Sequence, residues 1–451
     1  MKDLLISKLG QYATRTAIID NDKAFTYSDL LNDIITRYEK IKASVEKGEI
    51  VLLRSGYNFD GISTLFALAL NENIIVPVGE SSQVEADQRT LLSGASKVID
   101  FHQGNFEIIP VPVDRSGSRD SSSLIRELNE LSNPGIVLFS SGITGQPKAM
   151  VHNFHKFLEP YFQKRSKSLN FMAMLLFDHI GGLNTLLTAL FSGATLTIPK
   201  SNDPDIICRQ IEKHKVNILP GSPTMLNLIY ISGAYLNYDL SSLKIITYGT
   251  EPMPEGLLQK LNSIFPPTRF MQTYGTSETG ISKMSSKSSS SLKFKFDDPN
   301  TEIKIVDGEL WIKSSTTIIG YLNAEMQNFT NDGWFKTGDM VEQDDDGYIY
   351  IKGRNNNIIN VGGLKVFPQE VESVLMKLPF IENCVVYGEK SSITGNIVVC
   401  DIQLSKEQKA DNTKALILSF CRENMERYKV PVKIRFVDLI EYNDRFKKLI
   451  K

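Results

Sequence analysis

The chain has 451 residues and a formal net charge of −2, with 41% hydrophobic and 23% charged residues. This length exceeds one ordinary hydrophobic core, so two or more domains are expected. The near-balanced charge excludes a protein that relies on a broad basic surface to bind nucleic acid or an anionic membrane.

Cysteine usage and apolar patterning indicate a protein of a reducing compartment, which we take to be the cytoplasm. The four cysteines, Cys208, Cys384, Cys400 and Cys421, are far apart and form no C-x-x-C pair, which also argues against a structural metal. The N-terminus has no long apolar signal core, and the apolar stretch 65–78 is interrupted by polar residues and too short to span a membrane.

Residues 1–353 alternate between strand and helix patterns. Strands are expected at 50–54, 74–78, 136–140, 194–199, 218–221 and 243–248. Helical periodicity falls between them, for example at 205–215 and 254–264. Such alternation predicts α/β layers with mostly parallel strands, in which ligands bind at the carboxyl ends of the strands.

A polar loop follows the expected strand at 136–140. Within residues 139–150 (Phe-Ser-Ser-Gly-Ile-Thr-Gly-Gln-Pro-Lys-Ala-Met), glycines let N–H groups turn toward an anion, hydroxyls add donors and a lysine adds charge. The spacing G-x-x-x-x-G-K-[ST] is not met, because Gly142 and Gly145 are three apart and a proline precedes Lys148. The stretch predicts a phosphate-holding loop of another kind, although a plain Ser/Gly turn between a strand and a helix also fits it taken alone.

The pattern changes after residue 281. A serine-rich stretch at 285–291 predicts a flexible loop. Short alternating runs separated by Asp-Gly turns then predict a small antiparallel sheet or barrel at about 292–353.

A second boundary is expected at Gly353-Arg354, because three asparagines follow and favour a turn. The remaining residues are enough for an independent α+β domain. Its expected elements are helices at 368–377 and 409–428 and strands at 381–389 and 396–404.

Four further segments carry chemistry in a fixed order. Residues 274–278 read Tyr-Gly-Thr-Ser-Glu, residues 334–339 read Trp-Phe-Lys-Thr-Gly-Asp, residues 352–354 read Lys-Gly-Arg, and residues 446–451 read Phe-Lys-Lys-Leu-Ile-Lys. Each alone has an ordinary explanation as a strand end, a turn, a surface ion pair or a solvated basic tail.

Together with the loop, these segments resemble the acyl-adenylate-forming (AMP-forming) synthetase/ligase superfamily, which includes acyl- and aryl-CoA synthetases, adenylation domains of peptide synthetases and luciferases. The loop is similar to the family's S-S-G-T-T-G-x-P-K, and residues 26–30 are similar to its T-Y-x-E-L. The resemblance implies an α/β fold. A large N-terminal domain, residues 1–353, would hold two α/β subdomains and a small β-barrel, and residues 354–451 would form a small mobile α+β domain.

The family reaction has two halves and implies ATP, Mg²⁺ and coenzyme A as cofactors. A small-molecule carboxylic acid attacks the α-phosphate of ATP to give acyl-AMP, and a thiol then takes the acyl group and releases AMP. The first half joins two anions, so the site has to neutralise charge and hold both groups in line. We therefore predict an acid–CoA ligase with neither nucleic acid nor membrane as a partner.

The resemblance assigns the phosphate and metal side of the site. The β- and γ-phosphates are assigned to Ser140, Ser141, Gly142, Thr144, Gly145 and Lys148. Glu278 is assigned to Mg²⁺, which screens the phosphates, and is counted with Thr144 among the catalytic residues.

The resemblance also assigns the nucleoside side. Contacts to ATP or AMP are expected from Gly249, Thr250, Glu251, Tyr274, Gly275 and Ser277, with the Tyr274 ring stacked on adenine. Asp339 is expected to accept hydrogen bonds from the ribose hydroxyls, and Arg354 to contact the ribose or phosphate.

A lysine of the C-terminal domain is the expected catalytic group of the first half. Aligning the end of the chain with the family's G-K-I-x-R makes Lys448 this lysine, but Lys447 occupies the glycine position and is the competing assignment. A lysine on a mobile domain can be delivered for one half and withdrawn for the other. The hinge is assigned to Asn356, and the edge of the thiol channel to Gly362 and Gly363, which lack bulk.

Two alignments compete at residues 177–183 (Phe-Asp-His-Ile-Gly-Gly-Leu). Peptide-synthetase domains carry Phe-Asp here, which would make Asp178 an amine binder but needs an insertion. CoA ligases carry His-x-x-Gly-Leu, which fits without a gap and makes His179 a catalytic residue between the acyl pocket and the thiol tunnel. A buried histidine at a helix start is the ordinary alternative for His179.

Two other functions stay open beside the acid–CoA ligase. A stand-alone adenylation enzyme would load an acyl carrier protein, whose arm ends in the same pantetheine as coenzyme A. A binding protein without turnover is suggested by Ile143, which removes a donor from the loop, and by the altered C-terminal motif. The sequence does not identify the acid.

Overall fold

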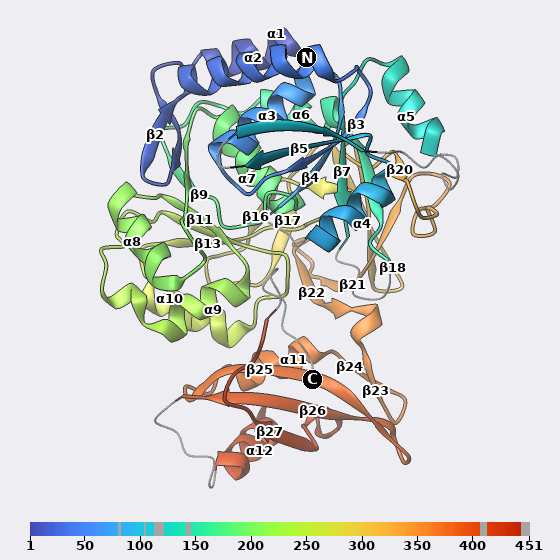
Figure 1. Ribbon diagram of the computed structural model, residues 1–451. Coiled ribbons are helices and arrows are strands. Elements are labelled where there is room, and N and C mark those ends of the chain that lie inside the picture. The colour runs from blue at the N-terminus through green and yellow to red at the C-terminus, as the bar shows by residue number, and fades with distance from the viewer. Residues whose placement is uncertain (80–82, 103–104, 112–120, 141–145, 406–412, 443–451) are drawn as a thin grey trace.

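The computed structural model describes residues 1–79, 83–102, 105–111, 121–140, 146–405 and 413–442. Figure 1 shows a large N-terminal domain, in which helices cover the sheets, and a smaller C-terminal domain in orange and red. The helices described in the large domain are α1 (Lys2–Gly10), α2 (Tyr27–Ser44), α3 (Phe59–Leu70), α4 (Gln83–Ser93), α5 (Ser121–Glu130), α6 (Phe154–Phe162), α7 (Ile180–Phe191), α8 (Pro204–His214), α9 (Pro223–Ser232) and α10 (Glu255–Ile264).

The first sheet has seven strands in the order β13-β12-β11-β9-β10-β1-β2. Their bounds are β1 (Thr16–Asp20), β2 (Lys23–Thr26), β9 (Asn170–Met172), β10 (Thr195–Ile198), β11 (Ile218–Gly221), β12 (Ile245–Tyr248) and β13 (Arg269–Gln272). All neighbours are parallel except β1 and β2. The carboxyl ends of β11, β12 and β13 therefore share one edge of this sheet.

The second sheet has the order β20-β8-β7-β4-β3-β5-β6. Its strands are β3 (Ile50–Arg54), β4 (Ile74–Val78), β5 (Lys97–His102), β6 (Asn105–Pro110), β7 (Gly135–Phe139), β8 (Ala149–Asn153) and β20 (Gly320–Tyr321). The central strands β7, β4, β3 and β5 are parallel, whereas β6, β8 and β20 run antiparallel to their neighbours. Every residue of β4, β7 and β8 is buried, as expected for strands covered on both faces.

A six-stranded antiparallel sheet follows, as the alternating runs predicted. Its order is β16 (Met284–Ser286), β17 (Phe294–Phe296), β22 (Ile349–Arg354), β21 (Phe335–Gln343), β19 (Glu309–Ser314) and β18 (Thr301–Val306). A short hairpin of β14 (Gly275–Thr276) and β15 (Gly280–Ile281) precedes it.

The serine-rich stretch at 285–291 lies mostly in the predicted loop, between β16 and β17, and hydrogen bonds attach this loop to the first sheet. It contains the end of β16, and its hydroxyls bond to β13, the edge strand of the first sheet. Ser286 Oγ accepts from the N–H of Gln272 at 2.8 Å, and Ser289 Oγ accepts from the N–H of Phe270 at 2.7 Å. An edge strand leaves such N–H groups without a strand partner. The serine hydroxyls accept the hydrogen bonds that a neighbouring strand would otherwise accept.

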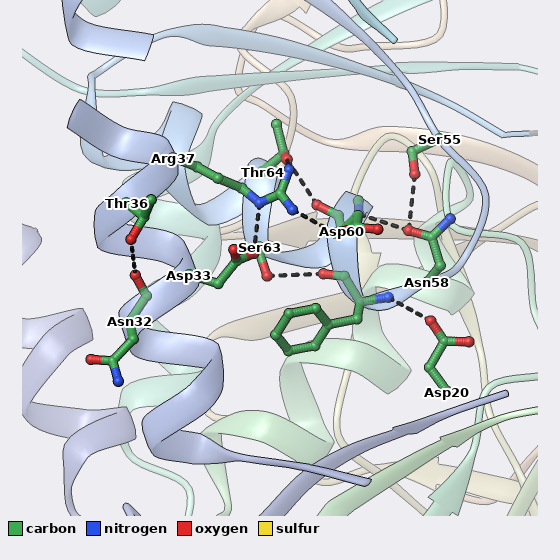
Figure 2. A network of polar contacts seen from close by, with 12 residues as sticks. Asp20, Asn32, Asp33, Thr36, Arg37, Ser55, Asn58, Asp60, Ser63 and Thr64 are labelled. Atoms are coloured by element: carbon green, nitrogen blue, oxygen red, sulfur yellow. Dashed lines mark hydrogen bonds and ion pairs between the residues drawn. The ribbon is translucent and has the colours of Figure 1, made fainter. Parts of the chain in front are cut away.

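A polar network joins the first sheet to α2 and α3 (Figure 2). Arg37 of α2 forms ion pairs with Asp33 at 2.6 Å and with Asp60 in the first turn of α3. Asp20, the last residue of β1, accepts a hydrogen bond from the N–H of Phe59 at 3.0 Å. Because β1 belongs to the first sheet and α3 packs on β3 and β4 of the second, the network ties the two α/β layers together.

The C-terminal domain is α+β. Its described elements are β23 (Ile359–Val361), β24 (Leu364–Val366), α11 (Pro368–Leu375), β25 (Ile381–Ser391), β26 (Gly395–Leu404), α12 (Thr413–Asn424) and β27 (Lys433–Phe436). The proposed boundary at 353/354 falls where β22 ends and the 3-10 turn Asn355–Asn357 begins. Cys384, Cys400 and Cys421 of this domain and Cys208 of α8 are buried and form no disulfide bond.

No helix in the described part of the chain is long and apolar enough to cross a membrane. The helices instead cover sheets, as Figure 1 shows for α3, α4 and α7.

The two domains pack through α10 and α11, which are in contact with each other. Gly256 of α10 lies so close that a Cβ atom built on it would be 2.4 Å from the carbonyl carbon of Met376. Lys260 Nζ donates to the carbonyls of Ile381 at 2.8 Å and Leu378 at 3.3 Å. Burial lowers the pKa of Lys260. This contact depends on Gly256, which has no side chain, and on Lys260, which donates hydrogen bonds to backbone carbonyls beyond the end of α11.

Substitution Gly256→Ala is expected to loosen the contact between the domains. Alanine favours a helix by about 1 kcal/mol over glycine, but here the added methyl group has no room against Met376. We expect a larger radius of gyration in small-angle X-ray scattering and faster limited proteolysis near Arg354.

The matched control is Gly10→Ala at the end of α1, where the nearest atom to the added Cβ, in Leu31, is 3.9 Å away. This control should leave both measurements unchanged. An unchanged scattering curve for Gly256→Ala would contradict the close packing described here.

Candidate functional site

The predicted phosphate loop connects two buried antiparallel strands, because β7 ends at Phe139 and β8 begins at Ala149. Ser140 closes the loop. Its N–H donates to the carbonyl of Lys148 at 3.1 Å, and its Oγ accepts from the N–H of Lys148 at 3.0 Å. The loop therefore returns to a strand and not to the helix that a plain turn would join. Four expected members of the loop lie outside the described residues: Ser141, Gly142, Thr144 and Gly145.

Lys148 and Glu278, the residues expected for phosphate and metal, meet at one tyrosine. Lys148 Nζ lies 5.4 Å from the centre of the Tyr321 ring, and Tyr321 Oη donates to Glu278 Oε1 at 3.2 Å. Burial and the neighbouring Glu278 carboxylate raise the pKa of Tyr321, so it remains a donor at neutral pH. The sequence analysis did not single out Tyr321.

The backbone around Glu278 is fixed at three consecutive carbonyls, those of residues 277–279. Their donors, in that order, are His152 Nε2 at 2.8 Å, the N–H of Ile318 at 2.8 Å and Thr316 Oγ1 at 2.7 Å. His152 is fully buried on β8 and was also missed, because a single histidine in an apolar strand gives no local signal of its partner.

The expected ribose residues form a second contact group. Tyr274 Oη donates to Asp339 Oδ2 at 2.5 Å, and Arg354 Nε donates to Asp339 Oδ1 at 3.2 Å. Burial raises the pKa of the Asp339 carboxyl, and the Arg354 guanidinium opposes that shift. Each carboxylate oxygen keeps a further lone pair, so Asp339 can still accept from ligand hydroxyls.

The Tyr274 ring has less free surface than stacking on adenine suggested. It stacks on Phe294 with the ring centres 5.8 Å apart, and its relative exposure is 9%. Because Phe294 covers one face of the Tyr274 ring, at most the opposite face is available to stack on adenine.

The expected adenine loop follows β12 and has a constrained backbone. A Cβ atom on Gly249 would lie 2.5 Å from Thr273 Oγ1, and Thr250 has a positive φ of 71°. Glu251 Oε1 accepts from the N–H of Thr224 in the first turn of α9 at 2.7 Å. One carboxylate oxygen of Glu251 thus stabilises the start of that helix.

Gln272 adds an unassigned acceptor at the same edge of the sheet. Its Oε1 atom is buried and has no hydrogen-bond partner among the described residues. Gln272 ends β13 two residues before Tyr274. An amino group such as that of adenine would satisfy this oxygen, and the position of Gln272 at the carboxyl end of a parallel strand is the signal that could have found it.

Asp178 and His179 have different surroundings in the structure. Asp178 forms an ion pair with Arg89 of α4, and the exposed fractions of the two side chains are only 7% and 4%. The guanidinium offsets the negative charge of Asp178, so this carboxylate would attract a substrate ammonium less than an unpaired one. His179 precedes α7, and its Nδ1 accepts from the N–H of Gly181 at 3.2 Å, so it caps the helix.

The expected hinge and thiol-channel residues are exposed. Asn356 lies in the 3-10 turn after β22. Gly362 and Gly363 form the two-residue turn between β23 and β24, with φ of 58° and 86° and no atom within 4 Å of an added Cβ. Positive φ at both positions explains the glycine pair without any ligand. Lys447, Lys448 and Lys451 lie outside the described residues.

Residues 274–278 bring the two contact groups together, because Tyr274 belongs to one group and Glu278 to the other. Four residue steps span at most roughly 14 Å. Among the described residues no cluster of three or more histidine, cysteine, aspartate or glutamate side chains could hold a metal alone. A single carboxylate beside a lysine that is predicted to bind phosphate suits Mg²⁺, which keeps several waters and binds substrate phosphates.

Comparison with known proteins identifies the family of the chain. The sequence profile of the AMP-binding enzyme family matches residues 7–322, and that of the AMP-binding enzyme C-terminal domain matches residues 370–447. The chain belongs to the AMP-binding enzyme family.

Two curated relatives of this AMP-binding enzyme are similar to it over most of their length. A 2-succinylbenzoate–CoA ligase of Bacillus licheniformis is 27% identical over 95% of this chain and 94% of the relative. A 4-coumarate–CoA ligase of Pinus taeda is 26% identical over 96% of this chain and 90% of the relative.

Solved structures share the fold of this AMP-binding enzyme. An anthranilate CoA ligase in complex with anthranoyl-AMP superposes with a TM-score of 0.83 at 20% identity, over 99% of this chain and 95% of the other. The o-succinylbenzoate CoA synthetase of Bacillus subtilis in complex with its acyl-adenylate gives 0.74 at 22% identity, over 98% and 96%. The α/β fold with a large N-terminal and a small C-terminal domain is confirmed.

The buried histidine of this AMP-binding enzyme predicts a pH-dependent stability. Burial lowers the pKa of His152 from 6.5 to about 4. As the pH falls, the unfolded chain takes up this proton first, so the stability is complete above pH 6.5 and is lost toward pH 4. The loss from this group amounts to roughly 3 kcal/mol.

The test is the free energy of unfolding by denaturant between pH 4 and 6.5 in wild type and His152→Gln. Glutamine keeps a donor for the carbonyl of Ser277 but does not titrate, so the variant should lose less stability over this range. His155→Gln on α6, whose side chain is 28% exposed, is the matched control. Identical pH slopes for wild type and His152→Gln would rule out the assignment.

Proposed function

We propose that this protein is an AMP-forming acid–CoA ligase. It would use ATP to convert a small-molecule carboxylic acid into an acyl-adenylate, and transfer the acyl group to the thiol of coenzyme A. The observation that carries the proposal is the arrangement along residues 274–278, with the candidate metal carboxylate at one end and the candidate ribose group at the other. The CoA-ligase names of its full-length relatives support coenzyme A as the acceptor.

In the first half two anions approach each other, and fixed positive charge has to offset their repulsion. Lys148 would neutralise the phosphates, while Ser140 holds its backbone on both sides. Mg²⁺ held by Glu278 would supply the further positive charge. Asp339 would accept from the ribose hydroxyls, so the nucleotide enters in one orientation.

In the second half the thiol replaces AMP, and the C-terminal domain is proposed to move between the halves. Lys448 would reach the α-phosphate in the first half and leave in the second, when the domain turns at Asn356. Gly362 and Gly363 would then border the channel of the thiol. His179 at the start of α7 is proposed to separate the acyl pocket from that channel.

We propose an aromatic acid without an α-amine as the substrate. The ion pair with Arg89 offsets the charge of Asp178, which is the candidate for binding an amine, so a substrate ammonium would gain less there. Several relatives are named for succinylbenzoate, coumarate or indoleacetate, which are acids with an aromatic ring. Because the four cysteines are buried and form no disulfide bond, we also propose the cytoplasm as its location.

The second candidate is an adenylation enzyme that loads an acyl carrier protein. One surface feature favours it: Leu364 and Ile393 are 49% and 91% exposed beside the glycine turn, where the N–H of Gly362 donates to Thr394. Exposed apolar side chains next to a thiol channel could contact a protein that carries the pantetheine arm.

The purified protein is expected to catalyse exchange between pyrophosphate and ATP that depends on an aromatic acid and on Mg²⁺. Labelled pyrophosphate measures the exchange, and mass spectrometry measures the thioester formed with coenzyme A or with a carrier protein. Amino acids serve as the control and should give no exchange. Thioester on the carrier alone would favour the second candidate, and no exchange with any acid would leave only a binding protein.

Substitution Lys448→Ala should slow acyl-AMP formation by roughly 100-fold or more, as loss of one transition-state donor does. Thioester formation from supplied acyl-AMP should stay largely intact, because that half does not use the lysine. Single-turnover assays of each half provide the measurement, with Lys447→Ala as the matched control. If Lys447→Ala shows this split instead, Lys447 is the catalytic lysine, and equal loss of both halves would refute the assigned role.

A further inference from the structure

Residues 320–323 (Gly-Tyr-Leu-Asn) lie directly beside the phosphate loop, although they are far from it in sequence. β20 pairs antiparallel with β8, with Tyr321 opposite Met150. The N–H of Leu322 continues the pairing by donating to the carbonyl of Ala149 at 2.9 Å. The segment therefore runs along the strand that starts immediately after Lys148.

The side-chain amide of Asn323 forms hydrogen bonds to the backbone on both sides of Lys148. Its Nδ2 donates to the carbonyl of Pro147 at 2.8 Å, and its Oδ1 accepts from the N–H of Ala149 at 2.8 Å. Ser140 bonds to the N–H and the carbonyl of Lys148 itself. Four successive backbone groups, from Pro147 to Ala149, are thus paired, so the backbone of Lys148 is fixed on both sides.

Tyr321 contacts the side chains of Lys148 and Glu278, whereas Asn323 contacts the backbone. The Lys148 ammonium lies 5.4 Å from the centre of its ring, within range of a cation–π attraction. Its hydroxyl bonds to the carboxylate of Glu278 at 3.2 Å. The relative exposure of Tyr321 is 8%, so its ring is held by packing and cannot follow a moving lysine.

We infer that Tyr321 and Asn323 are positioning residues that set the direction of the Lys148 ammonium and its separation from the Glu278 carboxylate before ATP binds. This inference rests on the proposed function, because it gives Lys148 to the phosphates and Glu278 to Mg²⁺. Tyr321 orients the Glu278 carboxylate through its hydroxyl and the Lys148 ammonium through its ring. Asn323 governs the lysine alone, through the backbone.

A purely structural role is the competing explanation, since a buried tyrosine next to a sheet stabilises any fold. The two explanations differ in what the hydroxyl does. If Tyr321 only fills space, removal of its hydroxyl leaves the Mg²⁺ requirement unchanged. If it orients Glu278, the same change shifts that requirement.

The experiment measures ATP binding by calorimetry over a range of Mg²⁺ concentrations without any acid, so that no turnover occurs. For Tyr321→Phe, which keeps the ring, the Mg²⁺ concentration at half-maximal binding should rise roughly tenfold, as for other lost partners of metal ligands. Tyr321→Leu should in addition weaken ATP binding at saturating Mg²⁺ by roughly fivefold. Asn323→Ala should weaken ATP binding with the Mg²⁺ requirement unchanged.

Tyr161→Phe is the matched control, because Tyr161 is also buried and its hydroxyl bonds to Asn184 at 2.9 Å, away from the loop. It should bind ATP as wild type does, and thermal unfolding verifies that each variant folds. Should Tyr321→Leu not fold, Tyr321→Phe and Asn323→Ala still decide the question.

The inference is overturned if Tyr321→Phe and Asn323→Ala both match Tyr161→Phe in Mg²⁺ requirement and ATP affinity. If wild type meanwhile shows acid-dependent exchange, only the positioning role fails and the proposed function stands. If wild type neither binds ATP nor exchanges pyrophosphate, both fall together.

Discussion

The site depends on the pairing of one buried strand, β8, with β7 on one edge and β20 on the other. The first pairing closes the phosphate loop through Ser140 and Lys148, and the second brings Tyr321 to the same lysine. His152 on β8 also holds the carbonyl before Glu278. A shift of one residue in either register would turn these side chains to the other face of the sheet, so register controls the chemistry of the site.

Burial explains how the polar groups of the site are kept in place. Asp339 and Tyr274 are almost fully buried and form a hydrogen bond with each other, and Arg354 is the second partner of the carboxylate. A buried polar group without a partner costs about 1–3 kcal/mol, so these groups have few alternative positions. The site is therefore largely built before a ligand arrives, and the exposed Arg354 is its adjustable member, with 63% of the side chain exposed.

The sequence predicted the parts of the fold that local patterns determine. Apolar runs located the buried strands β4 and β7, and the expected helix at 254–264 agrees with α10 to within a residue. Strands β1, β2, β5 and β6 were not predicted, because they are short or only half buried.

The site was predicted only where residues belong to one motif. The bond between Asn323 and Pro147 joins positions 176 apart, and no local pattern encodes it. The ion pair that occupies Asp178 likewise comes from a helix 89 residues earlier. The contacts of the serine-rich stretch were missed for the same reason, because its partner is the edge strand of a sheet that distant residues form.

The buried cysteines have a practical consequence for following the two domains. Burial raises the pKa of Cys208 to about 12 and that of Cys421 to about 11, so these thiols are protonated at neutral pH. Cys384 and Cys400 are equally inaccessible. The native thiols should thus react slowly with alkylating dyes, since the thiolate is the reactive form. A cysteine introduced on an exposed face of each domain would then carry a fluorophore selectively, and energy transfer between two such labels would test whether the small domain rotates as proposed.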